Sequence, residues 1–127
     1  MAKQYDGQDP SFKAYDDMSS SQYLFVVMNG DDIVDVCGAI TDVIVGVLQT
    51  EGTVGQGVLV RVDGHTKIIF GEDSVTAGAL LSTDAAGKAI SITAGGDTTT
   101  YVGGICTKGG DTDDVGEMIL QSRGRGA

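Results

Sequence analysis

Short apolar runs alternate with glycine-containing turns along most of this chain, and this pattern limits the folds open to it. In the run 58–62, VLVRV, the three valines fall on one face of an extended strand while Leu59 and Arg61 fall on the other. Similar runs occupy residues 22–29, 33–40, 42–50, 65–70, 79–83, 88–92, 101–108 and 117–122. The period is two rather than 3.6, and only 76–86 could hold a turn or two of helix. We therefore predict an all-β fold of about eight or nine short strands, a small Gly-rich β-barrel or sandwich.

The segments between the apolar runs have the composition of tight turns. The chain has 20 glycines and one proline. Asn29–Asp32, Asp63-Gly64 and Asp84–Gly87 each predict a hairpin connection between two of the runs. The stretch 52–57, GTVGQG, has the glycine content of a phosphate-binding loop, but its spacing is GxxGxG and a strand pattern, not a helix, follows. It is better interpreted as a flexible hairpin connection, in which Gly52, Gly55 and Gly57 can supply positive φ angles.

The two ends of the chain differ from its middle. Residues 1–21 are polar and contain Tyr5, Pro10, Phe12 and Tyr15 with no strand or helix period. Such a segment buries too little apolar surface to fold alone, so we expect an extended N-terminal arm, either disordered or binding a neighbouring molecule through these four residues. Residues 22–122 form the predicted β-domain, expected to fold without the arm, and 123–127 form a disordered tail.

The formal net charge is −10. Nucleic-acid binding needs clustered Lys and Arg, which are absent apart from the short tail RGRG, so nucleic acid and anionic membrane surfaces are not expected partners. The polar start gives no signal peptide, and no apolar stretch reaches the length of a membrane span. The acidic balance fits a highly soluble protein or one that docks on a basic partner.

Catalytic residue patterns are weak. His65 is the single histidine and is expected to be exposed at the start of a strand. Cys37 and Cys106 show neither CxxC spacing nor a nucleophile motif, and both are expected to be small buried residues; whether they pair stays open. A hydrolytic enzyme using His65 is therefore a minor alternative, and we expect no enzymatic activity.

Cofactor and metal patterns are weak as well. The acidic clusters at 29–35 and 111–117 lack the offsets of a calcium loop and are expected to be solvated turns. Residues 71–81, GEDSVTAGALL, resemble a turn of biotinyl and lipoyl carrier domains. Neither Lys67 nor Lys88 has the setting of a carrier lysine, so no cofactor is expected, and a carrier or small-ligand module is kept as the alternative function.

Residues 22–122 resemble the small capsid decoration, or cement, proteins of tailed bacteriophages. The resemblance rests on four parts in order: Gly46-Val47-Leu48, a glycine-rich loop with the hairpin pattern V-x-V-x-G-x-T-K at 60–67, the run VTAGALLSTDAAGKA at 75–89, and YVGGIC at 101–106 leading to a closing strand. These motifs are structural rather than catalytic.

The resemblance implies a function as well as a fold. Decoration proteins bind the outside of the phage head, commonly as trimers, and clamp neighbouring subunits of the major capsid protein. It therefore implies a non-enzymatic virion protein, made in the host cytoplasm, that binds the major capsid protein and copies of itself. An N-terminal arm often supplies strand addition or pocket contacts in this family, so Tyr5, Pro10, Phe12 and Tyr15 are the predicted capsid contacts.

Overall fold

A computed structural model describes residues 7–93 and 101–120, and the part of the chain it describes contains strands and turns but no helix. The strands are β1 (Gly7–Gln8), β2 (Ser11–Ala14), β3 (Phe25–Met28), β4 (Ile33–Val36), β5 (Gly46–Leu48), β6 (Gly57–Arg61), β7 (Asp63–Ile69), β8 (Leu80–Thr83), β9 (Ala89–Ile92), β10 (Gly104–Lys108) and β11 (Val115–Leu120). No described helix could therefore span a membrane. The predicted all-β fold of short strands is confirmed.

Five strands close into a small barrel in the order β2-β4-β3-β5-β6. Strand β2 closes it, because it pairs in parallel with β4 and antiparallel with β6. The barrel interior is filled by small and medium apolar side chains: Ala14, Met18, Val26, Val34, Leu48, Val58 and Val60. Val58 and Val60 are buried and Leu59 is exposed, as the alternation predicts.

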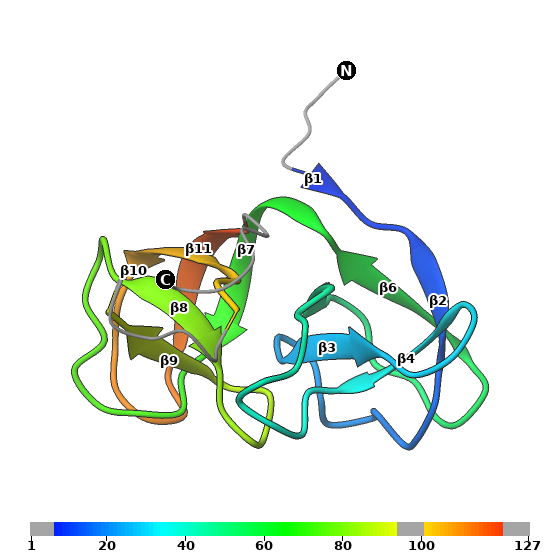
Figure 1. Ribbon diagram of the computed structural model, residues 1–127. Helices are drawn as coiled ribbons and strands as arrows, with labels where there is room; N and C mark the ends of the chain where they lie inside the picture. The colour runs from blue at the N-terminus through cyan, green and yellow to red at the C-terminus, as the bar shows by residue number, and fades with distance from the viewer. Residues whose placement is uncertain (1–6, 94–100, 121–127) are drawn as a thin grey trace.

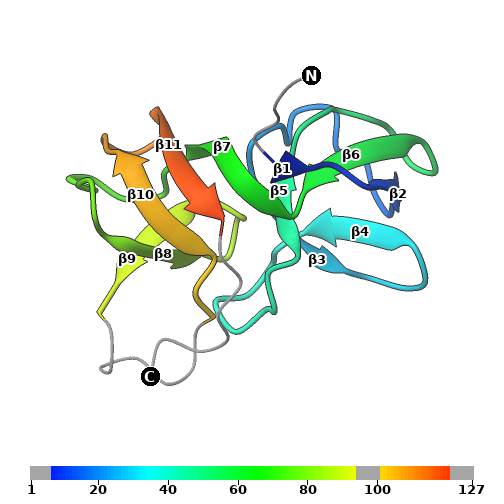
Figure 2. The ribbon, with the colours of Figure 1, turned by 90° about the horizontal axis from the view of Figure 1, so that it is seen from above.

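The other six strands form a curled sheet in the order β1-β7-β11-β10-β8-β9, which lies beside the barrel (Figures 1 and 2). The curl brings the end of β7 back to β9, since Phe70 bridges Ala89 and Gly71 N–H donates to Ala89 O at 2.8 Å. Beyond it, the Glu72 carboxylate accepts hydrogen bonds from the backbone and the hydroxyl of Ser91, at 3.0 and 2.5 Å. The β9 edge is therefore largely closed.

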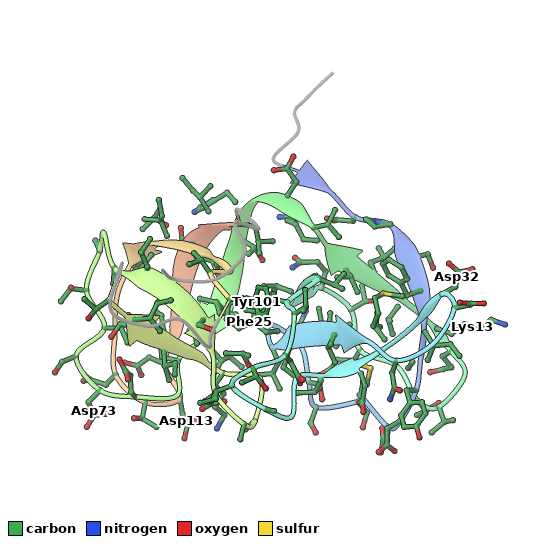
Figure 3. The ribbon with its side chains drawn as sticks, in the orientation of Figure 1. Lys13, Phe25, Asp32, Asp73, Tyr101 and Asp113 are labelled. Atoms are coloured by element: carbon green, nitrogen blue, oxygen red, sulfur yellow. The ribbon has the colours of Figure 1, made fainter. Side chains whose placement is uncertain are left out.

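The barrel and the sheet share a seam. Phe25, fully buried on β3, lies between them at the centre of the molecule (Figure 3). It belongs to the same cluster as Val47 of the barrel and Phe70, Leu81 and Met118 of the sheet. Burying an aromatic side chain of this size contributes about 2 to 3 kcal/mol. One apolar cluster therefore spans both units, while the barrel interior holds a second cluster of its own.

The predicted hairpin at Asp63-Gly64 is wrong. Strands β6 and β7 do not pair with each other: β6 belongs to the barrel and β7 to the sheet, with only Val62 between them. Gly64 does adopt a positive φ of 92°. The dipeptide therefore marks a bend in one nearly continuous strand that leaves one unit and enters the other (Figure 1).

The other predicted turns are confirmed. Strands β3 and β4 pair across residues 29–32, β5 and β6 across the loop that contains 52–56, and β8 and β9 across 84–87. In the middle loop only Gly55 has a positive φ, 80°. Gly52 is needed for a different reason, because a Cβ there would lie 2.8 Å from a methyl group of Val58.

The N-terminal segment also departs from the sequence-based expectation. Residues 11–14 are not a separate arm but strand β2 of the barrel wall, and Met18 is fully buried in the barrel interior. Backbone hydrogen bonds fix this segment to the β5–β6 loop: Ala14 N–H donates to Gln56 O at 2.9 Å and Met18 N–H to Gly52 O at 2.8 Å. A boundary at residue 21 therefore does not separate two parts of the fold. Residues 1–6 and the tail at 123–127 lie outside the described residues.

Candidate functional site

The four predicted contact residues differ in their exposure to solvent. Tyr5 lies outside the described residues. Pro10 is exposed, and its carbonyl accepts a hydrogen bond from Val60 N–H at 3.1 Å. Phe12 is half-buried and packs against the barrel core. Tyr15 is 53% exposed, while its backbone N–H donates to Val34 O at 2.9 Å. Of the three described residues, Pro10 and Tyr15 are presented to solvent on a backbone fixed by hydrogen bonds.

An open hollow of about 260 Å³ lies where the barrel meets the sheet, and we call it the junction hollow. Its lining comes from both units: Tyr23, Gln49 and Arg61 from the barrel side, and His65, Thr66, Lys67 and Glu117 from the sheet side. Gln49 Nε2 donates to Thr66 Oγ1 at 2.8 Å across the seam. The hollow gathers cationic groups in a chain of net charge −10.

Arg61 ties the N-terminal segment to this hollow. Its Nε and Nη2 donate to the two carboxylate oxygens of Asp9 at 2.8 and 2.9 Å, a bidentate ion pair. Its Nη1 donates to His65 O at 2.7 Å. A forked arginine–carboxylate pair fixes direction as well as distance. Asp9 is therefore held beside β7, close to where β1 pairs with β7.

His65 is in β7 and exposed. Its Nε2 lies 3.1 Å from Glu117 Oε1 and 3.4 Å from Thr107 Oγ1. A catalytic triad needs the carboxylate on one ring nitrogen and the nucleophile on the other. Here both partners meet the same nitrogen. The arrangement suits a surface hydrogen-bond cluster and gives the enzyme alternative no geometric support.

The cysteines are buried, as predicted, and both thiols are free. They belong to the core cluster of the sheet and the seam. Burial raises the pKa of Cys37 to about 12, with a smaller contribution from the negative charge of Asp42, and burial also raises the pKa of Cys106. Because the thiolate is the nucleophile, both side chains are poor nucleophiles at neutral pH.

Neither lysine considered for a carrier function is displayed without a partner. Lys88 follows the β8–β9 turn, and its Nζ lies 2.6 Å from Asp113 Oδ1. The hydrogen bond and charge of Asp113 raise the pKa of Lys88. Lys67 Nζ lies 5.8 Å from the ring centroid of Tyr23. A carrier lysine has to swing freely, so these contacts do not favour the carrier alternative.

The acidic residues of the second cluster hold loops together. Asp73 Oδ1 accepts from Thr112 N–H at 3.1 Å and from its hydroxyl at 2.8 Å, which lowers the pKa of Asp73. Asp111 Oδ1 accepts from Ser74 N–H at 3.0 Å. Asp73 and Asp113 both lie along the lower edge of the sheet unit in Figure 3. Within the described residues, no group of three or more potential ligands could hold a metal ion.

Sequence reasoning missed the junction hollow and the Asp9–Arg61 pair. The two residues are 52 positions apart, and no local pattern links them. Met18 was also missed as a core residue, because it stands alone in the polar run YDDMSS. The one usable signal was a lone apolar side chain in a polar segment.

The fold defines an all-β class: a closed five-stranded barrel joined through one bent strand to a curled six-stranded sheet. Among solved structures, the chain is similar to the N base of the head fiber protein gp8.5 of bacteriophage phi29, with a TM-score of 0.67 and 19% sequence identity. The match covers 91% of this chain and 96% of the phi29 chain. This likeness shows a shared fold from end to end. No protein-family model and no curated protein sequence matches the chain.

Proposed function

We propose that this chain is a structural protein of a phage virion, a decoration or cement protein. It binds the outer surface of the head, stabilises the lattice of the major capsid protein, acts as a trimer and has no enzymatic activity. The observation that carries the proposal is the end-to-end fold match with the base of a phage head fiber. The independent resemblance of residues 22–122 to capsid decoration proteins points the same way.

The surface chemistry supports a binding role. Tyr15 presents an exposed aromatic ring on a segment that is hydrogen-bonded to the barrel. An aromatic side chain held by a fixed backbone loses little conformational entropy on binding and is a frequent interface anchor. Many copies on one shell would make weak contacts of this kind collectively strong. Pro10 is exposed in the same segment, and Tyr5 precedes the described residues.

The proposal is tested by co-sedimentation of the purified full chain with phage heads that lack it. We expect saturable binding in fixed ratio to the major capsid protein, and sedimentation of the free chain as a trimer. Tyr15→Ala should weaken binding by about tenfold. Ile40→Ala is the matched control, because Ile40 is a comparably exposed apolar residue, at 47%, that is not a predicted contact.

Absence of co-sedimentation at every protein concentration would contradict head binding. If Tyr15→Ala and Ile40→Ala weakened head binding equally, Tyr15 would not be a specific contact, although head binding itself would stand. A monomer in the ultracentrifuge would overturn the trimer alone. Mass spectrometry of protein from its native host checks the carrier alternative, which requires a covalent adduct on Lys67 or Lys88.

A further inference from the structure

The outward face of β2 lies on the barrel wall. Because side chains alternate along an extended strand, Ser11, Lys13 and Tyr15 face outward and are exposed, while Ala14 is buried in the barrel. On one side of β2 lies the β3–β4 turn, and Lys13 N–H donates to Asp32 O at 2.8 Å. On the other side lies β6 with the loop before it. In Figure 3, Lys13 and Asp32 lie at the side of the barrel away from the sheet.

An open hollow of about 390 Å³ lies on this face and is lined by Ser11, Phe12, Lys13, Asp32, Gly55 and Gly57. Glycine creates the space, because Gly57 stands opposite Lys13 in the β2–β6 pair and has no side chain. A Cβ on Gly55 would meet nothing within 4 Å, and one on Gly57 would lie 3.5 Å from Ser11 Oγ. The hollow can therefore receive a side chain of another molecule beside the half-buried Phe12.

Two exposed apolar side chains lie next to the hollow. Val54, beside Gly55 in the loop, is 64% exposed, the highest value among the large apolar side chains of residues 7–93 and 101–120. Gly55 N–H donates to Ala14 O at 2.9 Å, which fixes the loop beside the segment that carries Tyr15. Tyr15 is 53% exposed. Apolar groups presented on an ordered backbone lose little conformational entropy when a partner covers them.

The charge around the hollow limits the partner. Four exposed carboxylates belong to the same segments of chain: Asp16, Asp17, Asp31 and Asp32. Lys13 is the one basic residue in the segments 11–17, 29–32 and 52–57. Complementary charge selects the partner and speeds association. The face therefore suits a basic partner rather than an acidic one.

We propose that the outward face of β2 is the capsid-docking surface, and that it binds a basic segment of the major capsid protein that carries an apolar side chain. The apolar side chain enters the hollow between Phe12 and Gly57, and Val54 and Tyr15 cover its flanks. Basic groups of the same segment meet Asp32 and the neighbouring carboxylates. The inference rests on the proposed function and adds to it the chemistry of the partner.

Filling the hollow tests the apolar part of the proposal. Gly57→Val places a side chain in the hollow from β6, where a β-branched residue suits the strand and the added Cβ makes an ordinary contact. Gly38→Val is the matched control, because it adds the same side chain at an exposed glycine whose Cβ would meet nothing within 4 Å. In co-sedimentation of the full chain with undecorated phage heads, we expect Gly57→Val to weaken binding at least about tenfold and Gly38→Val to leave it unchanged.

Neutralising one carboxylate tests the charged part. Asp32 has a φ of 58°, a conformation that asparagine tolerates, so Asp32→Asn keeps the shape of the turn. At about 0.05 M salt it should weaken head binding about threefold, and at about 0.5 M salt the difference should vanish because the charges are screened. Asp63→Asn, which neutralises an exposed carboxylate on β7, is the matched control and should bind like the unmodified chain.

The outcomes separate this inference from the proposed function. If the unmodified chain bound heads and Gly57→Val bound them equally well, the docking surface would lie elsewhere and the proposed function would stand. Tighter binding by Asp32→Asn at low salt would show an acidic partner and overturn the inference. If Gly57→Val dissociated the trimer while its binding to heads was unchanged, this face would join copies of the chain instead. Absence of head binding by the unmodified chain would overturn both.

Discussion

The N-terminal segment is a central part of the barrel but only an edge of the curled sheet. In the barrel, β2 is a wall strand with partners on both sides, and Met18 fills the interior. In the sheet, β1 contributes two paired residues at one end of β7. The barrel therefore depends on residues 11–18 for closure, while the sheet has most of its pairing without residues 7–8.

This difference divides a segment that looks uniform in the sequence. The part from Asp9 to Met18 is structural, because it is paired, ion-paired or buried. Of the part before it, the described residues 7 and 8 pair with one end of β7 at the edge of the sheet. A polar segment at a chain end can thus supply both a core element and a short edge strand, and its composition does not show where one ends and the other begins.

Two deletions separate these parts with the largest expected effect. Removal of residues 1–20 takes away β2 and Met18 and opens the barrel, so we expect loss of cooperative thermal unfolding and an aggregation-prone product. Removal of residues 1–6 should leave a cooperative transition within a few degrees of the full chain. Circular dichroism with thermal melting measures both. A cooperative unfolding transition after removal of residues 1–20 would show that the barrel does not need β2, and the proposed difference between barrel and sheet would be wrong.

A glycine substitution in each unit tests how tightly each is packed. A Cβ on Gly116 of β11 would overlap the carbonyl oxygen of Lys108 and the ring of Phe70, whereas one on Gly38 in the β4–β5 loop would meet nothing within 4 Å. We expect Gly116→Ala to destabilise the fold by about 3 kcal/mol and Gly38→Ala by less than about 0.5 kcal/mol. Urea denaturation measures both. Similar values for the two would mean that the sheet relaxes around the added methyl group.

The seam between the units should respond to alkaline pH. The pKa of Cys37 is raised to about 12 in the folded chain, mainly by burial, from the ordinary cysteine value of 9.0 that applies in the unfolded chain. Between these values the unfolded state binds fewer protons, so the contribution of Cys37 is fully present below pH 9 and falls by at most about 1.4 kcal/mol per pH unit above it.

Stability of Cys37→Ala measured from pH 8 to 11 should therefore fall less steeply than that of the unmodified chain. Other groups titrate in this range, so the difference between the two curves is the readout. Parallel curves would show that the Cys37 environment admits the thiolate.

Local pattern was sufficient to predict the strands and most turns. The alternation at Val58 and Val60, and the turns at Gly30 and Gly87, depend on neighbouring residues alone, and all were correct. The failures involve distant partners. Asp63-Gly64 correctly indicated a bend but not which strands lie on either side, because β6 pairs with β2 and β5 while β7 pairs with β11 and β1.

The candidate site shows the same limit. The parallel pairing of Lys13 with Ile33 closes the barrel, yet it joins positions 20 apart with no shared motif. The junction hollow needs residues from four separate segments of the chain to meet: 23, 49, 61–67 and 117. Phe12 is half-buried and Tyr15 exposed because their side chains meet different faces of the barrel wall, and the irregular spacing of the aromatics could not reveal those faces.

The closure of the strand edges has a consequence for crowding. Proteins held at high local density aggregate through exposed strand edges, where unpaired backbone groups recruit a neighbouring chain. The barrel has no edge, and β9 is sealed by Gly71 and by Glu72. Over the described residues, the strand at the other end of the sheet order, β1, is two residues long. Colloidal stability of densely packed copies should therefore be controlled by these few residues rather than by the whole sheet.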